Sequence, residues 1–179
     1  MAVNDPTCSY CGIANDARPR SPSLDARLAK SMESFRDKRY AEVIEICEGI
    51  LAEDPENVEA HYQCAGAWEE LGQPLRVMQA IRSILALRPG SALVHFNLGI
   101  LEAHYGDRAE AISRLKKALS LLNRDPDKAI SPPKRDEIRT RARQELRRLL
   151  EEKTEGDRGS RSGGLIHRAL SLLTRRKNP

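Results

Sequence analysis

The stretch HYQCAGAWEELGQP, residues 61–74, returns thirty-four residues later as HFNLGILEAHYGDR, residues 95–108. Each copy begins with a histidine followed by an aromatic residue, and each reaches a glycine at its twelfth position, Gly72 or Gly106. A fixed period of roughly 20 to 50 residues is typical of repeat architectures, in which every copy is one supersecondary unit. This period therefore decides the fold, and the rest of the chain is interpreted from it.

The same period extends outward from these two copies to give three units, residues 24–57, 58–91 and 92–125. Each unit contains two apolar-periodic stretches of about fourteen residues, separated by a polar break. In the second stretch of the third unit, the apolar residues recur at helical spacing: Ala111, Ile112, Leu115, Ala118, Leu119 and Leu122. Each unit is therefore predicted to be a helical hairpin, and the fold class is all-α.

The breaks contain residues that end or begin helices. Gly72 and Gly106 are expected to end the first helix of their units in the left-handed conformation, which glycine adopts without steric penalty. Pro74 stands at the first position of the next helix, where its missing N–H costs nothing. Pro55 and Pro89 follow the second helices and prevent their continuation.

In this pattern the chain resembles the tetratricopeptide repeat family over residues 24–125. The second unit has the family's residue types at Ala65, Gly72, Val77, Ile84 and Pro89, and the third at Gly99, Gly106, Ala111 and Ala118. The first unit is the poorest match, with Ser31, Lys38 where glycine is usual, Val43, Ile50 and Pro55. The resemblance implies a right-handed α-solenoid of three helical hairpins with a concave face formed by the first helices.

A further helix is expected within residues 126–153. Ser131 is a suitable N-cap and Pro132 a suitable first helical residue. One apolar stripe follows, made of Ile138, Ala142, Leu146, Leu149 and Leu150. Because repeat arrays need a terminal element with a polar outer face, we interpret this segment as a capping helix.

The paired histidines, His61 and His95, stand at position 4 of their units, where the family often has a large residue between the two helices. We interpret both as packing residues, because the pattern places no third metal ligand near them. The sequence contains no recognisable nucleophile, base and acid arrangement. We therefore expect a protein without enzymatic activity.

The resemblance also implies which side chains face the concave groove. At these positions large apolar residues alternate with amides: Leu28, Met32, Tyr62, Gln63, Phe96, Asn97 and Ile100. Apolar side chains on an open concavity usually mark a binding surface, although packing between neighbouring hairpins is an equal alternative for Leu28 and Phe96. The Lys, Asn and Arg clamp that some family members use for acidic C-termini is absent. We predict an adaptor or scaffold that binds a peptide or amphipathic helix of a protein partner.

The N-terminal segment, residues 1–23, is expected to be flexible and contains Cys8 and Cys11 at zinc-knuckle spacing. A structural zinc site needs four ligands, and Cys47 and Cys64 are expected to be buried repeat residues. The pair could thus be incidental, a dithiol, or half of a zinc site shared by two chains. The last reading gives the alternative function, a zinc-linked dimeric assembly protein; otherwise no cofactor is expected.

At the C-terminus, a linker over residues 154–164 precedes a basic amphipathic segment, residues 165–177. A helix this short needs a surface on which to fold. It could contact an anionic membrane surface as a peripheral anchor, bind a partner protein, or occupy the groove of its own chain. In the last case its arginines would face Glu59, Glu69 and Glu70.

The net charge of +4 has an uneven origin, because six basic and no acidic residues lie between Arg158 and the C-terminus. The repeats themselves are nearly balanced, which argues against nucleic acid as a partner. The sequence has no apolar run of the roughly 20 residues that span a bilayer, and its start has no signal-peptide pattern. We therefore expect a cytoplasmic protein.

Overall fold

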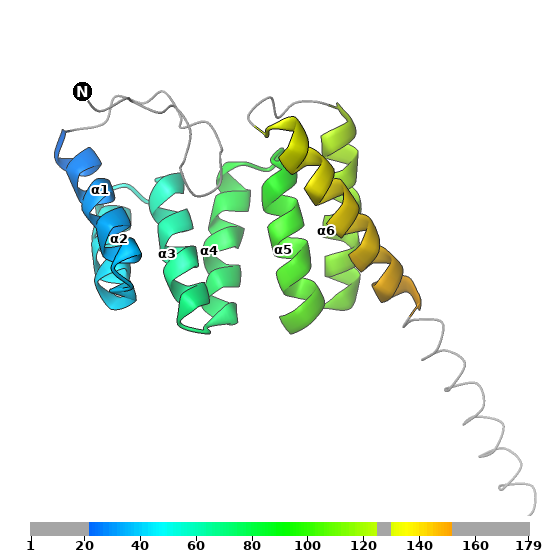
Figure 1. Cartoon of the computed structure of the whole chain (residues 1–179), viewed down its shortest axis with the longest axis horizontal. Helices are drawn as coiled ribbons and strands as arrows, with labels where there is room; N and C mark the ends of the chain where they lie inside the picture. Colours follow the sequence, from blue (N-terminus) through cyan, green and yellow to red (C-terminus); the bar gives the residue numbers. More distant parts are fainter. Residues whose placement is uncertain (1–21, 125–129, 152–179) are drawn as a thin grey trace, which may run out of the picture.

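The computed structural model describes residues 22–124 and 130–151. Six helices occupy the first range: α1 Pro22–Arg36, α2 Tyr40–Glu53, α3 Val58–Glu70, α4 Pro74–Leu87, α5 Ala92–Tyr105 and α6 Arg108–Arg124. A further helix extends over residues 132–151, and these two ranges contain no strand. Figure 1 shows three hairpins side by side, from α1–α2 in blue to α5–α6 in green, with helix 132–151 in yellow and orange running obliquely across the last hairpin. The predicted all-α solenoid of helical hairpins is confirmed.

The two turns between hairpins are built in the same way. The N–H of Asn57 donates to the carbonyl of Asp54 at 3.1 Å, and the N–H of Ser91 donates to that of Arg88 at 3.1 Å. The side-chain oxygens of Asn57 and Ser91 then cap α3 and α5 by accepting from the backbone N–H three residues further on. These caps satisfy donors that the first turn of a helix would leave unpaired.

The paired histidines close these turns. Nε2 of His61 lies 2.9 Å from the carbonyl oxygen of Pro55, and Nε2 of His95 lies 3.0 Å from that of Pro89. Because a carbonyl can only accept, Nε2 carries the proton in both rings. The histidines thus tie each hairpin to the turn that precedes it, which explains why they recur with the period of the repeat.

The breaks inside the hairpins differ from one unit to the next. Gly72 has a φ of 67°, as predicted, and Lys38, at the equivalent position of the first hairpin, adopts the same left-handed conformation with a φ of 61°. For Gly106 the prediction was wrong, because its φ is −132°. Gly106 is instead required for space: a Cβ there would lie 3.1 Å from Cα of Glu102 and 3.1 Å from Cε of Met78.

Small residues also bring the helices of a hairpin together. A Cβ on Gly99 of α5 would lie 2.9 Å from Cγ of Leu115 on α6. The glycine therefore lets Leu115 pack directly against the α5 backbone, and Leu115 is fully buried. This close approach is the physical reason for a small residue at position 8 of the repeat.

The buried side chains form two clusters that share α3. The N-terminal cluster joins α1 and α2 to one face of α3 and consists of Leu28, Val43, Ile44, Cys47, Ile50, Ala60, Cys64 and Ala67. The larger cluster joins the opposite face of α3 to α4, α5, α6 and helix 132–151. Half-buried Trp68 packs against both clusters. Helix 132–151 contributes Ile138, Ala142, Leu146 and Leu149, so it covers the last hairpin as a cap would.

A buried carboxylate connects three helices inside the larger cluster. Glu102 of α5 is only 1% exposed. Its Oε1 lies 3.3 Å from Nη2 of Arg82 on α4, and its Oε2 lies 3.7 Å from Nε of Arg114 on α6. A buried charge is tolerated where cations surround it, and here two guanidinium groups flank the carboxylate.

The left-handed residue of the first hairpin gives a test of this geometry. We expect Lys38→Gly to raise the free energy of unfolding by about 0.5–1 kcal/mol, because the change removes the strain of a side chain at positive φ. We expect Gly72→Ala, which introduces the same strain in the second hairpin, to lower it by about 1 kcal/mol. Urea denaturation measures both; a destabilised Lys38→Gly variant would contradict the assignment.

The buried histidine predicts a pH dependence. Burial lowers the pKa of His95, and nearby Arg114 and Lys117 lower it further, against the opposing hydrogen bond to Pro89. Because the folded protein binds this proton less readily than the unfolded chain, stability should fall as the pH decreases below about 6.5, the ordinary histidine value.

Denaturation of the wild type and a His95→Gln variant at pH 7.5 and pH 5.5 measures this effect. We expect the wild type to lose more stability on acidification than His95→Gln, whereas His61→Gln, which retains His95, should behave as the wild type does. Parallel losses in the wild type and His95→Gln would contradict the prediction.

Candidate functional site

The described part of the chain contains an open cavity of about 330 Å³ lined by α3, α4, α5 and helix 132–151. Its lining is mainly apolar and is contributed by Tyr62, Ala65, Gly66, Val77, Ile81, Leu93, Phe96, Ile100 and Leu101. The polar lining residues are Glu69, Asn97, Lys134 and Arg141. An apolar cavity with a few polar groups at its rim is the usual form of a binding site.

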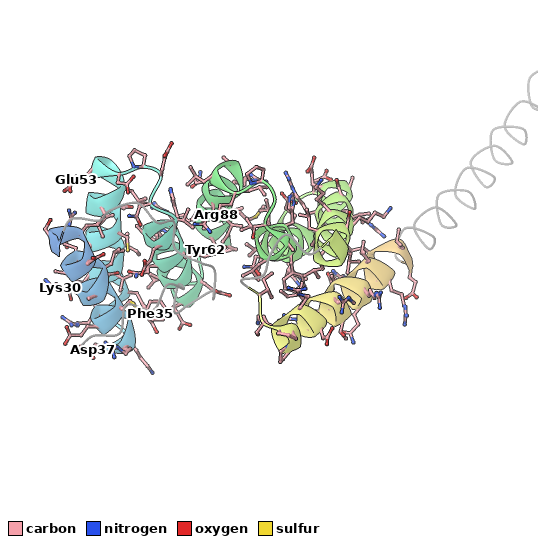
Figure 2. The ribbon with its side chains drawn as sticks, turned by 90° about the horizontal axis from the view of Figure 1, so that it is seen from above. Lys30, Phe35, Asp37, Glu53, Tyr62 and Arg88 are labelled. Atoms are coloured by element: carbon pink, nitrogen blue, oxygen red, sulfur yellow. The ribbon has the colours of Figure 1, made fainter. Side chains whose placement is uncertain are left out.

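Helical periodicity places these residues on common faces. On α3 the lining residues Tyr62, Ala65 and Glu69 recur three and four positions apart, so they share one face of the helix. On α5, Phe96 and Ile100 recur in the same way. In Figure 2, which looks at the molecule from above, Tyr62 lies on α3, and helix 132–151 crosses beside the last hairpin. Lys134 and Arg141 of this helix line one side of the cavity.

The aromatic residues of the cavity belong to the core as well as to the site. Tyr62 is 1% exposed and Phe96 is 5% exposed, and both pack into the larger cluster. The guanidinium carbon of Arg141 lies 5.6 Å from the centre of the Phe96 ring, within the range of a cation–π contact. Phe96 therefore links the apolar floor of the cavity to its charged rim.

Two cations from helix 132–151 form one side of the rim. Nζ of Lys134 lies 3.0 Å from Oε2 of Glu137, and Nη1 of Arg141 lies 3.4 Å from Oε1 of the same residue. The hydrogen bond from Lys134 lowers the pKa of Glu137 most, and Arg141 adds to this effect. Glu137 is therefore ionised at neutral pH and is held between the two cations.

Four of the predicted groove residues line the cavity: Tyr62, Phe96, Asn97 and Ile100. Met32 of α1 and Gln63 of α3 are outside its lining. Gln63 is 7% exposed, and its Oε1 accepts a hydrogen bond from the thiol of Cys47 at 3.7 Å. The side chain of Gln63 is therefore bound to the N-terminal cluster.

Leu28 is also outside the lining, and its assignment to an open groove needs correction. It is 3% exposed and belongs to the N-terminal cluster with residues of α2 and α3. The physical reason is its place in the solenoid: α1 packs on α2 and α3, and this packing takes up its apolar face. Leu28 thus follows the alternative reading, packing between neighbouring hairpins.

The sequence-based set omitted Lys134 and Arg141, because helix 132–151 was considered only as a cap. Their spacing of seven residues, two helical turns, places them on one face and was readable in the sequence. Val77 and Ile81 of α4 were also omitted, because the family pattern assigns the groove to the first helix of each hairpin. In this chain the cavity extends between α3 and α5 as far as α4, which contributes Val77 and Ile81.

The buried cysteines have the structural role expected of them. Cys47 and Cys64 are buried free thiols in the N-terminal cluster. A hydrogen bond with Cys47, together with burial, raises the pKa of Cys64, which disfavours the reactive thiolate. Oγ of Ser31 lies 3.2 Å from the Cys47 sulfur, so these polar atoms satisfy one another inside the core.

Several predictions concern residues outside the described ranges: the zinc-binding pair Cys8 and Cys11, the linker 154–164 and the basic segment 165–177. Within the described residues, no group of three or more His, Cys, Asp and Glu side chains could hold a metal ion. Each described helix is also too short or too polar to cross a bilayer.

Residues 34–95 match the model of the tetratricopeptide repeat family. This range begins near the end of α1 and includes α2, α3, α4 and the start of α5. No curated protein sequence matches the chain.

Solved structures with the same fold include three informative examples. SycD, a type III secretion translocator chaperone of Yersinia enterocolitica solved with a peptide of the translocator YopD, is 16% identical; the match covers 78% of this chain and 99% of SycD, with a TM-score of 0.63. PcrH of Pseudomonas aeruginosa, solved with the chaperone binding region of PopD, is 15% identical, with 76% and 98% covered and a TM-score of 0.61. The TPR domain of Sgt2 from Aspergillus fumigatus is 17% identical, with 80% and 89% covered and a TM-score of 0.56.

Identities this low show the fold alone, but the family model, the thirty-four-residue period and the stacked hairpins agree. The resemblance to the tetratricopeptide repeat family is thus confirmed over residues 34–95, and the described helices have the fold of tetratricopeptide repeat domains.

Proposed function

We propose that this protein is a non-enzymatic interaction module that holds a peptide or an amphipathic helix of another protein against its concave face. The observation that carries the proposal is the apolar cavity of about 330 Å³ between α3, α4, α5 and helix 132–151. A space of this size accommodates side chains of a ligand, and its lining is that of a binding pocket.

Binding would rely on apolar burial, with few polar contacts to fix the ligand. An apolar side chain that enters the cavity contacts Tyr62, Phe96 and Ile100 and leaves water. Full burial of one such side chain contributes about 1.5–3 kcal/mol, which corresponds to about a tenfold to hundredfold gain in affinity. Asn97 supplies an amide that can donate to or accept from the ligand backbone.

Two of the structures with this fold support the assignment to peptide binding. SycD was solved with a peptide of YopD, and PcrH with the chaperone binding region of PopD. These ligands belong to those proteins, and the present chain shares their architecture at 15–16% identity. The shared feature is the fold, which holds peptides in those two proteins. The ligand preference of the present chain would depend on the side chains of its own cavity.

The proposal predicts that filling the cavity abolishes binding. Tyr62 and Phe96 are unsuitable for this test, because both are core residues whose truncation would disturb folding. Ile100 is half-buried and lines the cavity, so Ile100→Trp would fill it with a larger side chain. A matched control is Leu75→Trp, because Leu75 is 67% exposed near the start of α4 and lies outside the cavity.

The probes are twelve-residue peptides selected from a displayed random library on the wild-type protein. We expect Ile100→Trp to weaken their binding by about tenfold or more, and Leu75→Trp to leave it unchanged. Fluorescence anisotropy measures the affinities, and thermal denaturation checks that both variants fold. Unchanged binding by a folded Ile100→Trp variant, or failure of the wild type to select any peptide, would overturn the proposal.

A further inference from the structure

On the helix 132–151 side of the cavity, positively charged side chains outnumber negatively charged ones. Lys134 and Arg141 line the cavity, and Glu137 lies between them without lining it. The exposed fractions of the two cationic side chains are 49% and 57%, so their donors can reach a ligand from solvent. At the edge of the apolar cavity, Lys134 and Arg141 therefore share a single carboxylate of the protein, that of Glu137.

The carboxylate of Glu137 uses only some of the N–H donors of Lys134 and Arg141. A lysine ammonium has three N–H donors and an arginine guanidinium has five. Glu137 takes one hydrogen bond from each residue, through a different oxygen in each case. A second carboxylate that approaches from the cavity would thus find donors that Glu137 does not use, and could also replace Glu137.

Phe96 places the apolar lining of the cavity beside the cationic rim. The guanidinium of Arg141 lies over the Phe96 ring, 5.6 Å from its centre, and the ring forms part of the apolar lining. A ligand side chain seated on Phe96 is therefore adjacent to the cations. This favours a ligand in which an acidic residue stands close to an apolar anchor.

We propose that Lys134 and Arg141 recognise the side-chain carboxylate of an Asp or Glu that neighbours the apolar anchor of the bound peptide, and that Glu137 competes with it. The inference rests on the proposed function, because it specifies the partner of the same cavity. It assigns to helix 132–151 a role in specificity beyond that of covering the last hairpin.

The same charges disfavour the chain's own basic segment as the occupant. Residues 165–177 contain Arg168, Arg175, Arg176 and Lys177 and no acidic residue. Placed in the cavity, these side chains would meet Lys134 and Arg141, and like charges at close range repel. Glu69 lies on the α3 side of the cavity, but the helix 132–151 side carries the excess of one positive charge.

Selection from the displayed library on the full-length wild-type protein tests the inference. We expect Asp and Glu to be enriched beside Leu, Ile or Phe in the selected peptides. One selected peptide is then synthesised with an amidated C-terminus, together with versions in which Gln or Lys replaces the acidic residue. The Glu version should bind about threefold to tenfold more tightly than the Gln version, and the Lys version most weakly.

Protein variants then locate the recognition. Arg141→Gln should reduce the preference for Glu over Gln by about threefold, whereas Glu137→Gln should increase affinity for the acidic peptide by about twofold to fivefold. The matched control is Arg143→Gln, which removes the same charge from the same helix but outside the cavity.

The outcomes separate this inference from the proposed function. Peptides that bind the wild type, lose binding in Ile100→Trp and show no preference among Glu, Gln and Lys would overturn carboxylate recognition and leave the peptide-binding function standing. Tighter binding of a synthetic 165–177 peptide than of the acidic peptide would also overturn it. Equal effects of Arg141→Gln and Arg143→Gln would refute the assignment to this rim.

Discussion

A hairpin of two amphipathic helices cannot bury its apolar faces by itself, and the rest of this structure depends on that constraint. Each hairpin is covered by the next, and α3, between two neighbours, is apolar on two faces: Ala60, Cys64 and Ala67 turn to one cluster, Tyr62 and Ala65 to the other. In the described residues the last hairpin is followed by helix 132–151, which supplies the surface that a further repeat would supply. This helix lies across the hairpin at an angle (Figure 1), and its Lys134 and Arg141 line one side of the cavity.

The architecture was predictable because the period that encodes it is local and is written three times. The caps and the histidines of the two turns between hairpins repeat with that period, whereas the breaks inside the hairpins differ. The lining of the cavity was predictable only where it follows the repeat, as at Tyr62 and Phe96. For Leu28 the sequence left groove and packing as equal alternatives, and the structure places it in the N-terminal cluster because α1 packs on its neighbours. The shared face of Lys134 and Arg141 was readable from their spacing, but its position beside the cavity was not, because the crossing angle of a terminal helix depends on packing and has no sequence period.

Charge is distributed along the solenoid in a way that the small net charge conceals. Residues 40–73 contain nine acidic residues and no Lys or Arg, whereas α4 contains no acidic residue and helix 132–151 has more basic than acidic side chains. The cavity lies where these regions meet, with Glu69 on one side and the two cations on the other. A ligand with unlike charges at its two ends would therefore be bound in one direction, because the reversed orientation would oppose like charges.

The division of the core into two clusters has a consequence for how the molecule opens. The cavity is lined by residues of α3, α4, α5 and helix 132–151, and α1 and α2 contribute none. Separation of the first hairpin would expose the N-terminal cluster but leave the cavity walls in contact with one another. Native-state hydrogen exchange would detect such a sub-global opening, in which α1 and α2 exchange before the elements that line the cavity. The first hairpin is thus the one that contributes nothing to the lining of the cavity.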